Sequence, residues 1–228
     1  MMGFARTQPS FVGGLDLLHA SSSVSSESCT QTTERAFESC VEQILLTASG
    51  WTQGSNAHWD KDRAFFPAYL IAFIKETQAD LWAEMETLHG SGLEPMILST
   101  LVKELDAKGS LHALRYGFKF YGKTFRLANF TPAHGANPEI IELYAKNRLT
   151  VTRQVPCHPS DNRTLDMVLA LNGLPVATIE LKNPGTGQTW RHAIRQFQND
   201  RDPRAPLFDF KKRALVHFAV DSIRKKST

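Results

Sequence analysis

Two carboxylates and a lysine in the second half of the chain carry the side chains with the clearest chemistry. Asp166 lies in one apolar run, and Glu180 and Lys182 lie at the end of the next. Hard cations such as Mg²⁺ bind oxygen ligands and keep several waters, so two carboxylates suit the protein's share of such a site. A bound cation would neutralise phosphate charge and lower the pKa of a water, and Lys182 would orient that water or stabilise the transition-state charge. The set therefore favours a metal-dependent phosphodiesterase, and among these a nuclease.

The two apolar runs predict an antiparallel pair of strands joined at residues 172–173. Side chains alternate along a strand, so Glu180 and Lys182 share one face. The rows that must share the other face are Leu165, Met167, Leu169 and Leu171 on the first strand and Ala177, Ile179 and Leu181 on the second. Pairing row with row places Met167 opposite Ile179, which brings Asp166 opposite Glu180. A two-residue turn gives a different register, so the sequence predicts a longer loop or a bulge near 172–174.

Short motifs also arise by chance, so each has a second interpretation. For the acids and the lysine, the alternative is a solvated strand face that carries an ion pair. Cys157 and His158 are adjacent metal-binding residue types, but no two further ligands stand at zinc-like spacing, which favours a structural role.

Longer stretches carry a family resemblance: ERAFE, GWTQG, NRLTVTRQVPCHPSDNRTLDMVLALNGLPVATIELKNPGTGQTWRHAIRQFQNDRDPRAPLF and FKKRALVHFAVD. Together they run from about residue 33 to 221. The chain resembles the N-terminal nuclease region of the restriction (R) subunit of type I restriction–modification enzymes, which belongs to the PD-(D/E)xK superfamily. The resemblance implies an α/β fold with a restriction-endonuclease-like mixed β-sheet flanked by helices. It also implies Mg²⁺ as cofactor, double-stranded DNA as substrate, and the methylation and specificity subunits as partners.

The resemblance also implies roles for individual residues. Asp166 and Glu180 match the metal ligands, Lys182 the catalytic lysine, and Gln196 the catalytic-site glutamine of the following helix. Family members often have a tyrosine directly after this glutamine or four residues later, where this chain has Phe197 and Asp200. In the superfamily an acid on the first helix sometimes approaches the metal, and Glu38 is the candidate here.

Helical periodicity surrounds the predicted strands. Thr33 is the expected N-cap of a first helix that ends near Gly50, with Glu34, Glu38 and Glu42 on or beside its exposed faces. Under that interpretation Glu38 is an ordinary solvated glutamate. Further helices are expected over 66–89, over 94–108 (closed by Gly109) and over 189–201, the last with Trp190, Ala193, Ile194 and Phe197 inward.

Basic residues near the acids are the candidate DNA contacts. They are Arg191, Arg195, Lys211, Lys212 and Arg213, which would hold phosphates without reading base sequence. Surface solvation accounts for the cluster at 211–213 equally well. Residues 111–130 interleave aromatic and basic side chains on expected strands. That segment fits either nucleic-acid stacking or a half-buried sheet with a charged outer face.

Composition and length indicate one main domain. The chain has 228 residues, 42% of them hydrophobic, and a formal net charge of +3. We expect a disordered N-terminal segment over 1–30, because it is serine-rich, and a nuclease domain over 31–221. No apolar run is long enough for a membrane span. Three cysteines, odd in number and without metal spacing, favour reduced thiols in a cytoplasmic protein.

The C-terminal segment 222–228 raises the question of function. Members of the resembled family continue into an ATP-driven translocase, so this tail is interpreted as a truncation or frameshift scar. No G-x-x-x-x-G-K-[ST] motif is present, so the ATP used by full-length members has no predicted site in this chain. Two hypotheses follow: a Mg²⁺-dependent endodeoxyribonuclease module without intrinsic sequence specificity, or a non-catalytic remnant that at most binds DNA or the other subunits.

Overall fold

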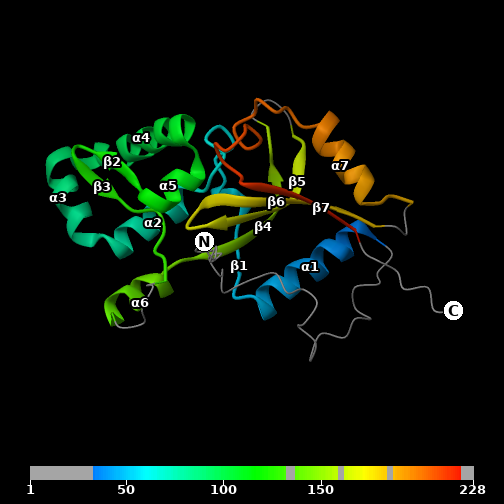
Figure 1. Ribbon diagram of the computed structural model, residues 1–228, viewed down its shortest axis with the longest axis horizontal. Helices are drawn as coiled ribbons and strands as arrows, with labels where there is room; N and C mark the ends of the chain where they lie inside the picture. The colour runs from blue at the N-terminus through cyan, green and yellow to red at the C-terminus, as the bar shows by residue number, and fades with distance from the viewer. Residues whose placement is uncertain (1–32, 132–136, 159–161, 184–186, 222–228) are drawn as a thin grey trace, which may run out of the picture.

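The structure is a computed structural model that describes residues 33–131, 137–158, 162–183 and 187–221 (Figure 1). The expected disordered segment 1–30 and the tail 222–228 lie outside the described residues.

A mixed five-stranded sheet lies between two helices. In spatial order its strands are β1 (Thr52–Gln53), β4 (Leu149–Pro156), β5 (Thr164–Leu171), β6 (Leu174–Lys182) and β7 (Val216–Asp221). Strands β4, β5 and β6 pair antiparallel, whereas β1 and β7 are parallel to their neighbours. Helix α1 (Glu34–Ala48) covers one face and α7 (Trp190–Asn199) lies over the other (Figure 1). The predicted α/β fold with a mixed sheet and flanking helices is confirmed.

Each face of the sheet has its own apolar core. Thr33 caps α1 as expected, because its hydroxyl accepts from the Ala36 N–H at 3.3 Å. Phe37 and Leu45 of α1 then pack on Met167, Leu169, Ala177, Ile179 and Leu181. The opposite face buries Leu165, Val168 and Ala170 with Phe66, Leu207 and Ala214. Leu165 therefore leaves the row that the sequence assigned to it, which indicates that β5 departs from regular alternation next to Asp166.

A helical layer is inserted between β1 and β4. It contains η1 (Asn56–His58), α2 (Pro67–Thr77), α3 (Ala79–His89), η2 (Gly90–Gly92), α4 (Leu93–Lys108), α5 (Ser110–Tyr116) and α6 (Pro138–Ala145). The prediction of a single helix over 66–89 is wrong. The helix is interrupted at Gln78 (φ −139°, ψ 46°), which separates α2 from α3. The Gln78 side chain explains the break: its amide donates to the Arg126 carbonyl (2.9 Å) and accepts from the Arg126 N–H (2.8 Å). The end of α4 at Gly109 is as predicted.

The segment 111–130 is only partly extended, which corrects the expectation of strands throughout. Its first residues continue α5, and a short hairpin follows, β2 (Phe118–Phe120) and β3 (Lys123–Phe125). Phe118, Phe120 and Phe125 are buried in the core of the helical layer. Those three rings are therefore core, whereas Tyr116 and Tyr121 are exposed.

The β5–β6 hairpin has the predicted register, reached by a different route. Met167 pairs with Ile179, as the apolar rows required. The two-residue turn is kept, however, with left-handed Asn172 (φ 51°) and Gly173 (φ 87°). The expected bulge lies after the turn, where the register shifts so that Val176 has no partner on β5. A side chain at Gly173 is excluded because a Cβ there would lie 2.6 Å from the Phe66 carbonyl oxygen.

Candidate active site

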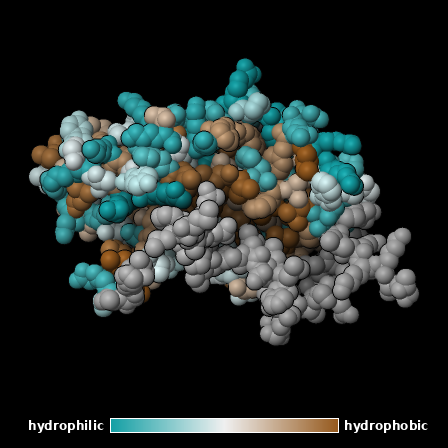
Figure 2. All heavy atoms as spheres, viewed as in Figure 1, coloured by the Kyte–Doolittle hydropathy of each residue, from teal (hydrophilic) through white to brown (hydrophobic). Residues whose placement is uncertain are grey.

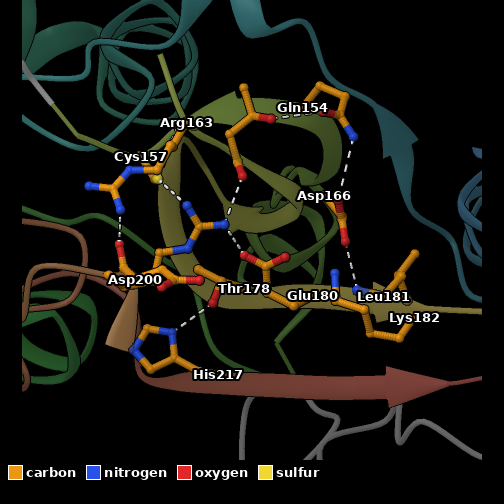
Figure 3. A network of polar contacts seen from close by, with 12 residues as sticks. Gln154, Cys157, Arg163, Asp166, Thr178, Glu180, Leu181, Lys182, Asp200 and His217 are labelled. Carbon is orange, nitrogen blue, oxygen red and sulfur yellow. Dashed lines mark hydrogen bonds and ion pairs between the residues drawn. The ribbon is translucent and has the colours of Figure 1, made fainter. Parts of the chain in front are cut away.

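The candidate site lies where β5 and β6 part. Their backbone pairing reaches Met167 and Ile179, and beyond it the Asp166 carboxylate accepts the Leu181 N–H through Oδ2 at 2.7 Å. The Asp166 carboxylate thus accepts the Leu181 N–H, which in a regular antiparallel ladder would be bonded by a backbone carbonyl of β5. Figure 3 shows the Asp166 and Glu180 carboxylates above the same stretch of β6. Both acids therefore lie near the end of this strand pair.

Asp166 faces a pocket beneath α1. The pocket has a volume of about 1180 Å³, and its lining includes Glu34, Glu38, Gln154 and Asp166. Gln154, in a left-handed conformation (φ 50°), donates from Nε2 to Glu38 at 3.1 Å and reaches Asp166 Oδ1 at 3.5 Å. Gln154 thereby links the candidate acid of the first helix to the acid of β5.

Glu38 and Glu42 are buried, which corrects the expectation that they lie on exposed faces of the helix. Glu38 is 4% exposed, and both carboxylates pair with Arg153 of β4, at 2.9 Å and 3.1 Å. A paired charge tolerates burial, whereas a lone one does not. The interpretation of Glu38 as a solvated glutamate is therefore wrong, and its carboxylate is held by Arg153 and Gln154.

Glu180 is 1% exposed and forms an ion pair with Arg201, a pairing that the sequence did not predict. Lys182 is also largely buried, and its Nζ lies 3.1 Å from Glu34 Oε1 at the start of α1. Asp166, Glu180 and Lys182 thus lie near the parted strand ends, but different elements hold their side chains: Lys182 is bonded by Glu34 of α1, and Glu180 by Arg201 after α7. The signal for these partners was absent from the local pattern, since Arg201 and Glu34 are 21 and 148 positions away.

Burial and repulsion from neighbouring carboxylates shift the acids toward their neutral forms. Burial raises the pKa of Glu180 to about 7, against the attraction of Arg201 and with a contribution from Asp166. Burial likewise raises the pKa of Asp166, opposed by the Leu181 N–H and by Lys182. Two buried carboxylates that repel each other are the arrangement in which a bound divalent cation most strongly favours the charged forms.

This shift predicts how stability depends on pH. The folded pKa of Glu180, about 7, lies above its ordinary value of 4.5. The contribution of protonated Glu180 to the free energy of unfolding is therefore fully present below about pH 4.5, and it is lost as the pH rises through about 7. Urea unfolding without metal at pH 5 and pH 8 should show wild type losing up to roughly 3 kcal/mol relative to Glu180→Gln. Parallel pH dependence in the two proteins would contradict the shift.

The donors present fit a hard cation. Asp166 and Glu180 together offer carboxylate oxygens, which Mg²⁺ combines with retained waters. Glu180 uses Oε1 for Arg201, which leaves Oε2 as an oxygen that can face a cation. Among the described residues, no group of three or more His, Cys, Asp or Glu side chains is placed to hold a metal. The protein's share of a metal site would thus consist of two acids.

The predicted basic contacts separate into exposed and buried residues. Arg191 and Arg195 are exposed on α7, where hydrophilic side chains gather (Figure 2). Lys211 is exposed, and Lys212 lies 2.7 Å from Asp209. Arg213 is 1% exposed and donates to the Arg63 carbonyl (2.7 Å) and to Asp106 (3.0 Å). The expectation that Arg213 contacts DNA is therefore wrong, because its guanidinium is committed to the interior.

Helix α7 is less deeply packed than its periodicity predicted. Ala193 is buried, but Trp190 and Ile194 are exposed, contrary to expectation. Gln196 is half-buried, and no hydrogen bond between its side chain and either acid is found in the described residues. Phe197, at one position of the family tyrosine, packs against Phe208 and His217. It contributes apolar packing where a tyrosine would offer a hydroxyl.

The cysteines differ from expectation in one case. Cys157 is a buried thiol whose sulfur lies 3.2 Å from the Arg163 carbonyl oxygen, whereas Cys40 is disulfide-bonded, so the expectation of reduced thiols is wrong for Cys40. His158 lies 3.7 Å from Asp202. The Cys157 sulfur and the His158 ring thus have protein partners, as a structural role requires.

Comparison with known proteins identifies the family. Among the described residues, no helix is long and apolar enough to cross a membrane. No curated protein and no solved structure matches the chain. A family model described as type I restriction enzyme R protein N terminus matches residues 31–223. Because that match covers most of the 228 residues, the chain belongs to the family of N-terminal regions of type I restriction enzyme R proteins.

Proposed function

We propose that this chain is the nuclease module of a type I restriction R subunit, a Mg²⁺-dependent endodeoxyribonuclease of the PD-(D/E)xK type. The observation that supports the proposal is that Asp166 and Glu180 lie where β5 and β6 stop pairing, close enough to Lys182 for its charge to lower the pKa of both acids. Electrostatic coupling also supports the proposal. The Leu181 N–H and Lys182 lower the pKa of Asp166, while Asp166 raises and Lys182 lowers the pKa of Glu180.

The chemistry follows from where these groups lie. Asp166 and Glu180 would hold Mg²⁺, which when bound neutralises phosphate charge and acidifies a water. The Leu181 N–H fixes the Asp166 carboxylate by bonding Oδ2. The Lys182 ammonium, bonded to Glu34, lies close enough to lower the pKa of both acids and would stabilise the negative charge that develops on the phosphate. Gln196, in the second half of α7, would contact the DNA or the water network.

DNA would be held through phosphates. Arg191 and Arg195 project from α7, and Lys211 lies exposed before β7. Arginine and lysine contacts to phosphate position a duplex without reading its sequence. The proposal therefore assigns sequence recognition to other subunits of a type I complex, which are the proposed partners together with double-stranded DNA.

Salt dependence tests this source of affinity. Binding to two unrelated duplexes should weaken equally and steeply with salt, because each phosphate contact contributes about −0.9 to the slope of log K against log salt. Arg191→Ala combined with Arg195→Ala should make the slope shallower by about 0.9 for each arginine that binds a phosphate. Lys75→Ala, a substitution at an exposed lysine of the helical layer, is the control. A strong preference for one duplex, or binding indifferent to salt, would contradict the proposal.

The direct experiment is cleavage of plasmid and linear duplex by the purified chain with Mg²⁺ or Mn²⁺, and with EDTA as the control. We expect metal-dependent cleavage at positions unrelated between substrates. A folded protein that binds duplex yet leaves it intact under all these conditions would overturn the proposal in favour of a non-catalytic remnant.

A further inference from the structure

Arg201, just beyond the end of α7, has an unusual place for an arginine beside a candidate metal site. It is 5% exposed, and its guanidinium bonds three separate segments of the chain. One nitrogen, Nη2, contacts Glu180 of β6 and the Thr164 carbonyl of β5 at 2.8 Å, and Nη1 reaches the Cys157 sulfur at 3.0 Å. A single side chain thus ties together the loop after β4 and the ends of β5 and β6.

The bonds of Arg201 lie where β5 and β6 separate. Strands β5 and β6 stop pairing beyond Met167 and Ile179, and Arg201 bridges them through Nη2 on the open side. Asp166 bridges the same strands by accepting the Leu181 N–H. The gap between the ends of β5 and β6 is therefore spanned by the cation of Arg201 and by the anion of Asp166.

The same contacts fix Glu180. Arg201 binds its Oε1, so the carboxylate cannot rotate freely, and the second oxygen is left for another partner. The guanidinium is planar and presents its donors in a rigid fork, which lysine cannot imitate. Its Nε is buried without a partner in the described part of the chain. An apolar residue would fill this interior position without that unmet donor, so stability alone does not account for an arginine here.

We propose that Arg201 is a positioning residue for the proposed metal ligand Glu180, which it orients while bridging the separated ends of β5 and β6. This inference rests on the proposed nuclease function. Outer partners of ligating carboxylates typically contribute about 10- to 100-fold to metal affinity or activity. On this proposal Arg201 acts through Glu180, because its guanidinium is bonded to Glu180, the Thr164 carbonyl and the Cys157 sulfur.

The test compares Arg201→Lys with the matched control Arg204→Lys. Arg204 is 90% exposed and pairs locally, with Asp202. Four quantities are measured on the full chain: melting temperature without metal, Mn²⁺ affinity by calorimetry, duplex affinity by fluorescence anisotropy, and the single-turnover cleavage rate at saturating Mg²⁺.

For Arg201→Lys we expect Mn²⁺ affinity and the cleavage rate each to fall about 10- to 100-fold, with duplex affinity unchanged. A purely structural role would instead lower the melting temperature and leave the metal affinity and rate of the folded protein unaltered. That result, or wild-type values throughout, would overturn the inference.

Two further variants separate folding from positioning. Arg201→Met leaves Glu180 buried without its cation, and if it fails to fold, Arg201→Met combined with Glu180→Gln restores a neutral pair. We expect the double variant to recover the melting temperature, because the unpaired Glu180 carboxylate is what destabilises Arg201→Met; a double variant that stays unfolded would show that the fold itself requires Arg201 and would overturn the inference. If wild type and Arg204→Lys neither bind Mn²⁺ nor cleave, the proposed function fails and this inference fails with it. If they do both and Arg201→Lys matches them, only the inference fails.

Discussion

Asp166→Asn and Glu180→Gln should each reduce Mg²⁺-dependent DNA cleavage to the level seen with EDTA. Each change removes a negative charge from the two-acid set that would hold the cation. The amides are chosen because their oxygens keep the native hydrogen bonds, one with the Leu181 N–H and the other with the Arg201 guanidinium. Glu180→Ala would instead leave the Arg201 guanidinium buried without its ion-pair partner, which would lower the free energy of unfolding by about 3–5 kcal/mol.

The measurement is a time course of plasmid nicking, with melting temperatures taken in parallel. Asp106→Asn is the matched control, because it also removes a carboxylate paired with a buried arginine, Arg213, at 3.0 Å in the helical layer. We expect this control to cleave DNA at the wild-type rate. Cleavage at wild-type levels by the combined Asp166→Asn and Glu180→Gln variant would remove the nuclease assignment.

Lys182→Met should lower the cleavage rate by about a hundredfold to a thousandfold, the usual cost of losing one preorganised charge-stabilising group. Methionine keeps much of the length of the largely buried lysine chain, so the fold and the two acids remain in place. Duplex affinity should stay within about threefold, because Arg191, Arg195 and Lys211 supply the phosphate contacts.

Single-turnover rates on a labelled duplex at saturating Mg²⁺ give this measurement, with Lys75→Met as a control for removal of a paired lysine, whose partner is Glu94. Glu34→Gln is an informative companion, since it releases Lys182 from its partner and leaves the ammonium intact. We expect that variant to retain most of the activity. A Lys182→Met rate close to wild type would show that the ammonium takes no part in the chemistry.

The sequence by itself determined which residues lie opposite one another in the hairpin. Alternating apolar rows on 164–171 and 174–182 admit one register that buries both, and Met167 indeed pairs with Ile179. Local rules also determined the N-cap at Thr33 and the end of α4 at Gly109, because capping depends on a few neighbouring residues. The family resemblance, carried by longer stretches, was confirmed by the family match.

Only the tertiary structure decided how the charges of the site are held. Arg201 forms an ion pair with Glu180, and Arg153 forms ion pairs with Glu38 and Glu42. Arg213 is buried and forms an ion pair with Asp106. A charge on an exposed face and a charge paired in the interior give the same local pattern, so periodicity cannot separate them. What separates them is whether the folded chain brings an opposite charge close enough to offset desolvation, and these partners lie far apart in sequence.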